Sequence, residues 1–117
     1  MSRDYDMARY FIEAAAEQDL PEAINELGAM YGKGLGVEKD REQSVRLYRR
    51  AAELDNSHAN FNLGIMLING DEVPRDLEGG VAYLCRAAEL GDEQSKVVLA
   101  RLADEYGIGP GADLTLQ

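Results

Sequence analysis

The chain has 117 residues, of which 45% are hydrophobic and 29% are charged, so it is long enough for one domain with its own core. Twelve basic and 22 acidic side chains give a formal net charge of -10, which disfavours binding to nucleic acid or to an anionic membrane surface. No apolar run approaches the roughly 20 residues that span a bilayer, and the acidic N-terminus does not have the pattern of a signal peptide. Composition therefore predicts a soluble, acidic protein of the cytoplasm.

A repeat of 36 residues runs through the chain without a gap. One tripeptide recurs at that interval, as Ala15-Ala16-Glu17, Ala51-Ala52-Glu53 and Ala87-Ala88-Glu89. This many ungapped matches indicate an array of like structural units rather than coincidence. The repeat divides the single domain, residues 1–117, into units 4–39, 40–75 and 76–111, with a degenerate tail over 107–117.

Each unit carries two helical patterns and no strand pattern. In chain order the predicted helices cover residues 5–18, 21–32, 41–54, 57–69, 77–90 and 93–106. An aspartate (Asp4, Asp40 or Asp76) stands before the first helix of each unit, where its side chain can accept a backbone N–H. Pro21 suits the first turn of the second helix, and Gly91 is a typical stop after the fifth.

The spacing of apolar and small residues predicts how the helices pack. In the middle unit Leu47, Tyr48 and Ala51 fall on one helix face, which one helix pair cannot bury by itself. Gly28 and Gly64 occupy the same position of the repeat and allow neighbouring helices to approach closely. Pairs that share a core by stacking form an α-solenoid, so the predicted fold is all-α with antiparallel helix pairs.

The combined motif of the repeat resembles that of a known family. It reads Leu27-Gly28-x-x-Tyr31-x-x-Gly34-x-Gly36-Val37-x-x-Asp40, followed by Tyr48-x-x-Ala51-Ala52-Glu53. This motif is similar to the Sel-1-like repeat, a relative of the tetratricopeptide repeat. The resemblance covers nearly the whole chain. It implies a right-handed superhelix that scaffolds protein-protein contacts, and it implies no chemistry of its own.

The second and third units depart from this motif. The second loop keeps one glycine, Gly70, and the third unit has Leu99-Ala100 in place of Leu-Gly. The last helix has an alternative register, shifted by three residues, in which Leu102-Ala103 and Tyr106 provide the motif. We favour the ungapped register.

The resemblance also implies where a partner binds, because the helix that carries Leu-Gly lines the concave face of such solenoids. The predicted partner-binding residues are Glu22, Asn25, Glu26, Ala29, His58, Phe61, Asn62, Ile65, Asn69, Gln94, Val97, Arg101 and Glu105. They would form an apolar centre (Phe61, Ile65, Val97) with an acidic rim. The alternative is that Phe61 and Val97 pack between adjacent helices as ordinary core.

No catalytic, cofactor-binding or metal-binding site is predicted. The run Gly32-Lys33-Gly34-Leu35-Gly36 follows a helix, whereas a phosphate-binding loop follows a strand. His58 has no partner at metal-ligand spacing, and Cys85 has no nearby base, so we expect a helix-surface thiol. The sequence therefore predicts a non-catalytic interaction module. The alternative is a small acidic immunity or inhibitor protein that covers the active site of a basic toxin or enzyme.

Two further surface predictions concern the outer helices. The middle outer helix is predicted to have a solvated basic face, formed by Arg46, Arg49 and Arg50. These arginines are expected to make weak ion pairs with Glu42, Glu53 and neighbouring residues. On the first helix, the side chains of Tyr5, Met7, Tyr10 and Phe11 are expected to cap or extend the core. Both ends of the array expose half a repeat, so the face of Tyr5, Tyr10 and Phe11 is also a candidate contact for a weak homodimer, and the alternative is a monomer.

Overall fold

The computed structural model describes residues 3–71 and 73–107, with side chains from Asp6 onward. These residues form six helices and no strand: α1 (Arg3–Glu17), α2 (Pro21–Lys33), α3 (Arg41–Glu53), α4 (Ser57–Asn69), α5 (Leu77–Glu89) and α6 (Glu93–Glu105). α2, α4 and α6 begin 36 residues apart, and so do α3 and α5. The all-α fold and the ungapped register are therefore confirmed. The tail from residue 108 onward lies outside the described residues.

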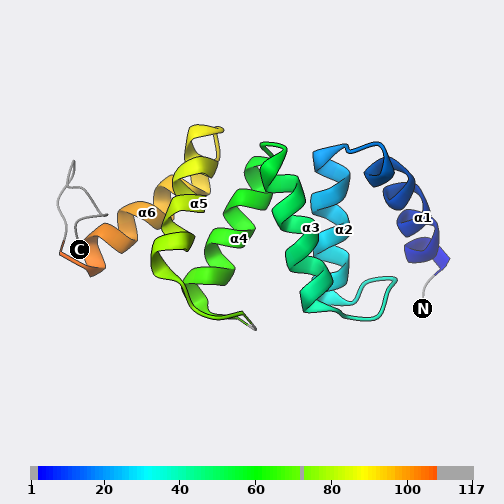
Figure 1. Cartoon of the computed structure of the whole chain (residues 1–117), viewed down its shortest axis with the longest axis horizontal. Coiled ribbons are helices and arrows are strands. Elements are labelled where there is room, and N and C mark those ends of the chain that lie inside the picture. The colour runs from blue at the N-terminus through cyan, green and yellow to red at the C-terminus, as the bar shows by residue number, and fades with distance from the viewer. Residues whose placement is uncertain (1–2, 72, 108–117) are drawn as a thin grey trace.

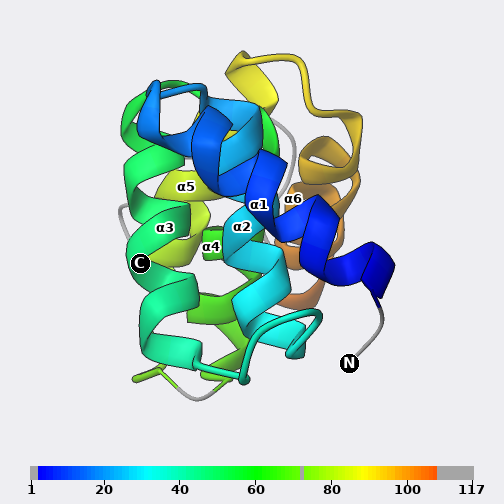
Figure 2. The same cartoon turned by 90° about the vertical axis from the view of Figure 1, so that its right-hand side faces the viewer.

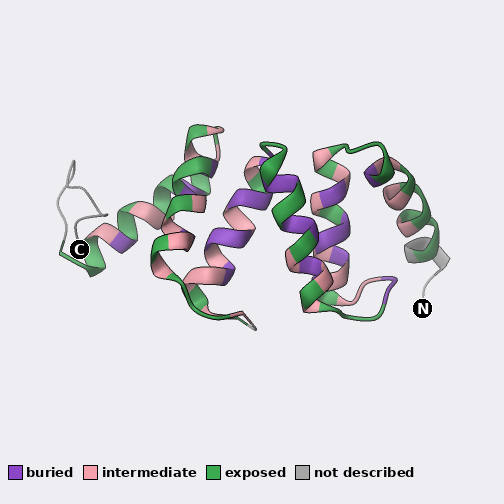
Figure 3. Cartoon of the chain, in the orientation of Figure 1, coloured by how far each residue is buried: buried purple, intermediate pink, exposed green. Residues whose placement is uncertain are grey.

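The helices stack in chain order along the long axis of a molecule that measures 50 × 25 × 18 Å (Figure 1). α1 and α6 lie at its opposite ends, and the view along the stack shows successive helices running back and forth (Figure 2). α2 packs most extensively on α3, and α4 on α5. Buried residues are concentrated on α2, α3 and α4, α5 has three of them, and α1 and α6 are largely exposed (Figure 3). The core thus lies in the middle of the stack.

Side-chain caps fix where most helices begin. Asp40 accepts a hydrogen bond from the Gln43 N–H at 3.1 Å, and Asp76 accepts one from the Gly79 N–H at 2.9 Å, as predicted. The prediction for Asp4 is wrong, because α1 begins at Arg3 and places Asp4 inside the helix. Asn56 and Asp92 cap α4 and α6 in the same way, and the sequence analysis did not identify them.

The helices α2 and α4 end in the same backbone geometry. Gly34 and Gly70 adopt φ values of 73° and 67°, and their N–H groups donate to the carbonyl oxygens of Met30 and Met66. A side chain is strained in this left-handed region, so glycine ends each helix. Gly91, with φ 99°, follows α5 as predicted.

Close helix approach centres on the repeated glycines. A Cβ atom on Gly28 would lie 2.9 Å from Cδ1 of Tyr48, and one on Gly64 would lie 2.8 Å from Cγ of Leu84. Both distances are shorter than atoms can tolerate without movement. The expectation that these glycines allow α2 to approach α3, and α4 to approach α5, is confirmed.

Ion pairs of one kind connect successive repeats. Arg50 pairs with Asp19 in the turn between α1 and α2, and Arg86 pairs with Asp55 in the turn between α3 and α4, with Nη2 and Oδ1 2.7 Å apart in the second pair. Both aspartates have positive φ values, 58° and 62°. The predicted partners of Arg50 were glutamates on its own helix, and that prediction is wrong because Arg50 reaches across to the preceding turn.

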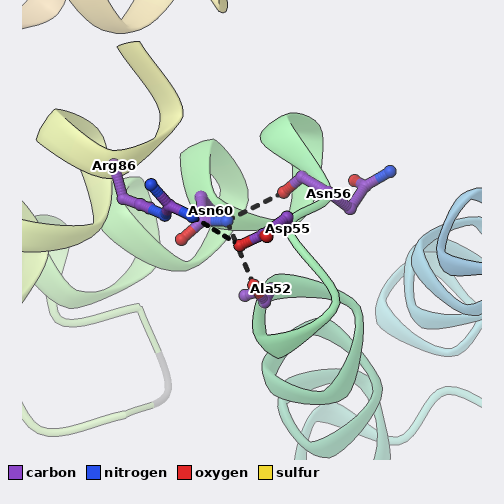
Figure 4. A network of polar contacts seen from close by, with 5 residues as sticks. All are labelled: Ala52, Asp55, Asn56, Asn60 and Arg86. Atoms are coloured by element: carbon purple, nitrogen blue, oxygen red, sulfur yellow. Dashed lines mark hydrogen bonds and ion pairs between the residues drawn. The ribbon is translucent and has the colours of Figure 1, made fainter. Parts of the chain in front are cut away.

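The turn between α3 and α4 also holds a buried polar network (Figure 4). The Asn60 amide donates to the carbonyl oxygen of Asn56 at 2.9 Å and to that of Ala52 at 3.5 Å. Asn60 is 2% exposed, and Ile24 occupies the same repeat position at 0% exposed. The same place in the core is therefore filled by a polar side chain in one repeat and an apolar one in another.

Candidate functional site

The predicted partner-binding residues all lie on α2, α4 and α6, and none of them is buried. Eight are exposed: Glu22, Glu26, His58, Asn69, Gln94, Val97, Arg101 and Glu105. Five are half-buried: Asn25, Ala29, Phe61, Asn62 and Ile65. We call this set of thirteen residues the α2/α4/α6 face. Their partial or full exposure follows from the helix period, which turns the neighbouring Leu-Gly positions into the core.

The α2/α4/α6 face is continuous from α2 to α4. Nδ2 of Asn62 donates a hydrogen bond to Oδ1 of Asn25 at 3.2 Å, which joins the two helices across the face. The 36-residue register places Phe61 opposite Val98 in the corresponding position between α4 and α6. Both asparagines were predicted on this face, but the bond between them was not. The two residues are 37 positions apart, one more than the repeat length, so the repeat does not pair them.

Three residues of the face have large apolar side chains. Phe61 and Ile65 are half-buried, and Val97 is 59% exposed. The alternative prediction that Val97 packs as core is therefore wrong, and Phe61 keeps part of its surface open. The equivalent of Phe61 on α2 is Asn25, so the repeat itself does not require an aromatic ring here.

Titratable groups that could support chemistry are dispersed. The described residues contain no group of three or more His, Cys, Asp or Glu side chains that could hold a metal ion. His58 is exposed, and so is Cys85, as expected for the thiol. Partial burial, and to a lesser degree the Glu89 carboxylate, raise the pKa of the Cys85 thiol above its ordinary value. The thiol is therefore less ionised near neutral pH than an ordinary cysteine, which disfavours a role as nucleophile.

The aromatic side chains of α1 do not extend the core. Met7, Tyr10 and Phe11 are 53%, 70% and 62% exposed, which corrects the prediction that they cap the helix stack. The Tyr10 and Phe11 rings pack edge to face, with centroids 5.6 Å apart. The side chain of Tyr5 lies outside the described residues. In the part of the chain that the structure describes, no helix is long and apolar enough to cross a membrane.

Stacked antiparallel helix pairs with a 36-residue register define an α-solenoid. The Sel1 repeat model matches residues 1–20, 21–56 and 57–92, so the chain belongs to the Sel1 repeat family. The model takes α2 with α3, and α4 with α5, as its units, which are the pairs that pack most extensively. Sel1 repeat proteins are generally protein-interaction scaffolds without catalytic activity.

Solved structures of the same kind are similar over most of the chain. A Sel1 repeat protein from Oxalobacter formigenes is 30% identical with a TM-score of 0.85, over 92% of this chain and 44% of that one. A protective antigen of uropathogenic Escherichia coli strains, which displays an SLR fold, is 33% identical with a TM-score of 0.80, over 90% of this chain and 22% of that one. This chain thus spans less than half the length of either.

A third solved structure supports the fold alone. Cysteine rich protein B of Helicobacter pylori is 23% identical with a TM-score of 0.73, over 77% of this chain and 68% of that one. A comparison with curated proteins finds no match to the chain.

Proposed function

We propose that the chain is a non-catalytic interaction module that receives a segment of a partner protein on its α2/α4/α6 face. The observation that carries this proposal is that three large apolar side chains of the face keep surface open: Val97 is 59% exposed, and Phe61 and Ile65 are half-buried. Exposed apolar side chains that the fold does not require are a usual mark of an interaction surface. The family supports this assignment, since Sel1 repeats generally bind proteins.

The chemistry of the face indicates what the partner segment would present. Apolar side chains would contact Phe61, Ile65 and Val97, and the surrounding carboxylates of Glu22, Glu26 and Glu105 would favour basic residues at the edges. Contacts in the centre would contribute most of the binding energy, and the charged rim would mainly accelerate association at low salt.

The test first isolates a partner and then measures how a substitution at one exposed side chain changes the affinity for that partner. A partner is obtained by affinity purification from the native host, and its binding to the purified chain is measured by calorimetry. Val97→Asp places a charge in the apolar centre and should weaken binding at least about tenfold. Met7→Asp is the matched control, because it makes the same change at an exposed apolar residue on α1. Equal loss in both variants, or no loss in either, would reject the face.

Several finer predictions stay predictions. No observation favours an immunity or inhibitor protein over a general adaptor, and the two differ in the number of partners they bind. Location in the cytoplasm and the choice between a monomer and a weak homodimer are likewise open to direct measurement, by fractionation and by sedimentation at several concentrations.

A further inference from the structure

A shallow cleft of about 350 Å³ lies on α3, beside the loop that joins α4 to α5. Its lining includes Arg41, Val45, Arg46, Arg49, Val73 and Pro74. The start of α3 and this loop both lie along the lower edge of the view in Figure 1, and an ion pair of 2.7 Å between Arg41 Nη2 and Asp71 Oδ2 joins them. The cleft shares no residue with the α2/α4/α6 face.

The 36-residue register separates two kinds of arginine on α3. Arg50 recurs as Arg86, and both pair with the aspartate of the preceding turn, so their role belongs to the repeat. Arg46 and Arg49 do not recur: the corresponding residues are Tyr10 and Ala82 for the first, and Glu13 and Cys85 for the second. The stack therefore forms without an arginine at either position, and these two side chains need another explanation.

Arg46 and Arg49 keep most of their hydrogen-bond donors open. Arg46 makes one hydrogen bond, from Nη1 to Oε1 of Gln43 at 3.3 Å on the same helix. Arg49 makes no hydrogen bond or ion pair within residues 3–71 and 73–107. Glu42 also lines the cleft, so among the described lining residues one carboxylate stands against three guanidinium groups, of which that of Arg41 is paired with Asp71. In a protein with a net charge of -10, this is a local excess of positive charge.

We propose that this cleft binds an acidic segment of a partner protein in which an Asp or Glu lies next to an aliphatic residue. Guanidinium groups match carboxylates with two parallel hydrogen bonds, and Arg46 and Arg49 are one turn apart on the same helix. Val45, Val73 and Pro74 provide an apolar wall for the neighbouring aliphatic side chain. A long polyanion such as nucleic acid would extend beyond the cleft onto an acidic surface, which disfavours it.

The experiment measures the binding of defined probes by fluorescence anisotropy at low salt. The probe is a fluorescein-labelled peptide of alternating Asp, Leu and Glu residues, and its control has Asn and Gln in place of the acids. The chain should bind the acidic peptide and lose at least about tenfold in affinity with Arg49→Glu. Lys96→Glu is the matched control, because it makes the same charge change at an exposed residue on α6, away from the cleft.

Each outcome decides for or against the cleft. Loss of binding in Arg49→Glu alone, with the unfolding transition of both variants unchanged, supports it. Equal loss in both variants would mean that only the overall charge matters, and no binding by the unaltered chain would overturn the proposal directly. Equal binding of the amide peptide would exclude a carboxylate site. Tighter binding of a labelled oligothymidylate than of the peptide would favour nucleic acid instead.

Discussion

The helix pairs α2/α3 and α4/α5 have the same lengths and register, yet they cross with different contacts. In the first pair the Ser44 hydroxyl donates to the Gly28 carbonyl oxygen at 2.7 Å, so a side chain fills the crossing. In the second pair Gly64 and Gly80 face each other, and a Cβ on either would lie within 2.9 Å of the other's carbonyl oxygen. One crossing uses side chains that can adjust, and the other brings two backbones together.

This difference predicts the largest stability effect, at the glycines. Gly64→Ala would force apart two backbones, which should lower the free energy of unfolding by about 2 kcal/mol even after the better helix propensity of alanine is counted. Gly28→Ala meets the edge of the Tyr48 ring, which can tilt, so its cost should be below about 1 kcal/mol. Urea unfolding followed by circular dichroism measures both. A Gly28→Ala variant as unstable as Gly64→Ala would contradict the contrast.

The two turns between repeats sharpen the same comparison. Both have the arginine-aspartate pair, but the buried position behind it holds Ile24 in one turn and Asn60 in the other. A buried polar residue is tolerated when its hydrogen bonds are made, and Asn60 donates to two carbonyl groups. Those carbonyl groups also accept backbone N–H groups, from Asn60 to Asn56 and from Asp55 to Ala52. The Asn60 side chain is therefore not the only partner that satisfies them.

The second prediction places the apolar residue of the first turn at the buried position of the second turn. Asn60→Ile, which copies Ile24, should change the free energy of unfolding by no more than about 1 kcal/mol, because the carbonyl groups stay bonded. Asn60→Ala leaves the space empty and should lower the free energy of unfolding by about 1–2 kcal/mol. The same urea titration measures both variants. If Asn60→Ile lowered the free energy of unfolding as much as Asn60→Ala, refilling the space would bring no benefit, and the hydrogen bonds that both variants lose would matter more than the packing.

The regular parts of the molecule were accessible from the sequence because local physics repeats every 36 residues. Caps such as Asp40 and glycine stops such as Gly34 act within one turn of the chain, so the helix bounds differ from the predicted ones by only one or two residues. The prediction for Asp4 failed because it relied on the repeat alone. No residue before Asp4 indicates that the helix begins earlier, at Arg3.

Features that depend on contacts between repeats were not accessible in the same way. Arg50 and its partner Asp19 are 31 positions apart in the sequence. A prediction based on helix spacing pairs Arg50 with residues on its own helix instead. The exposure of Val97 depends on what stands next to α6, and the sequence left it open between face and core. The cleft on α3 needs the loop around Val73 to be placed beside Arg49, which no spacing rule provides.

The smallest expected effect concerns the Tyr48 phenol in the crossing of α2 and α3. Burial raises the pKa of the Tyr48 phenol above 10.0, and the hydrogen bond with Ser44 and the charge of Arg41 offset this only in part. The folded state then holds the proton more tightly than the unfolded chain does. As pH rises above about 10, the unfolded chain loses its proton first, so the free energy of unfolding falls from there upward.

The α4/α5 pair has Leu84 at this position and should add no such slope, which gives the third prediction. Tyr48→Phe should flatten the decline in the urea midpoint above about pH 10. Tyr10→Phe is the matched control, because Tyr10 is 70% exposed, and it should leave the decline unchanged. If both variants flattened the decline equally, general tyrosine ionisation would explain it, and burial at the crossing would have no part in the alkaline loss of stability.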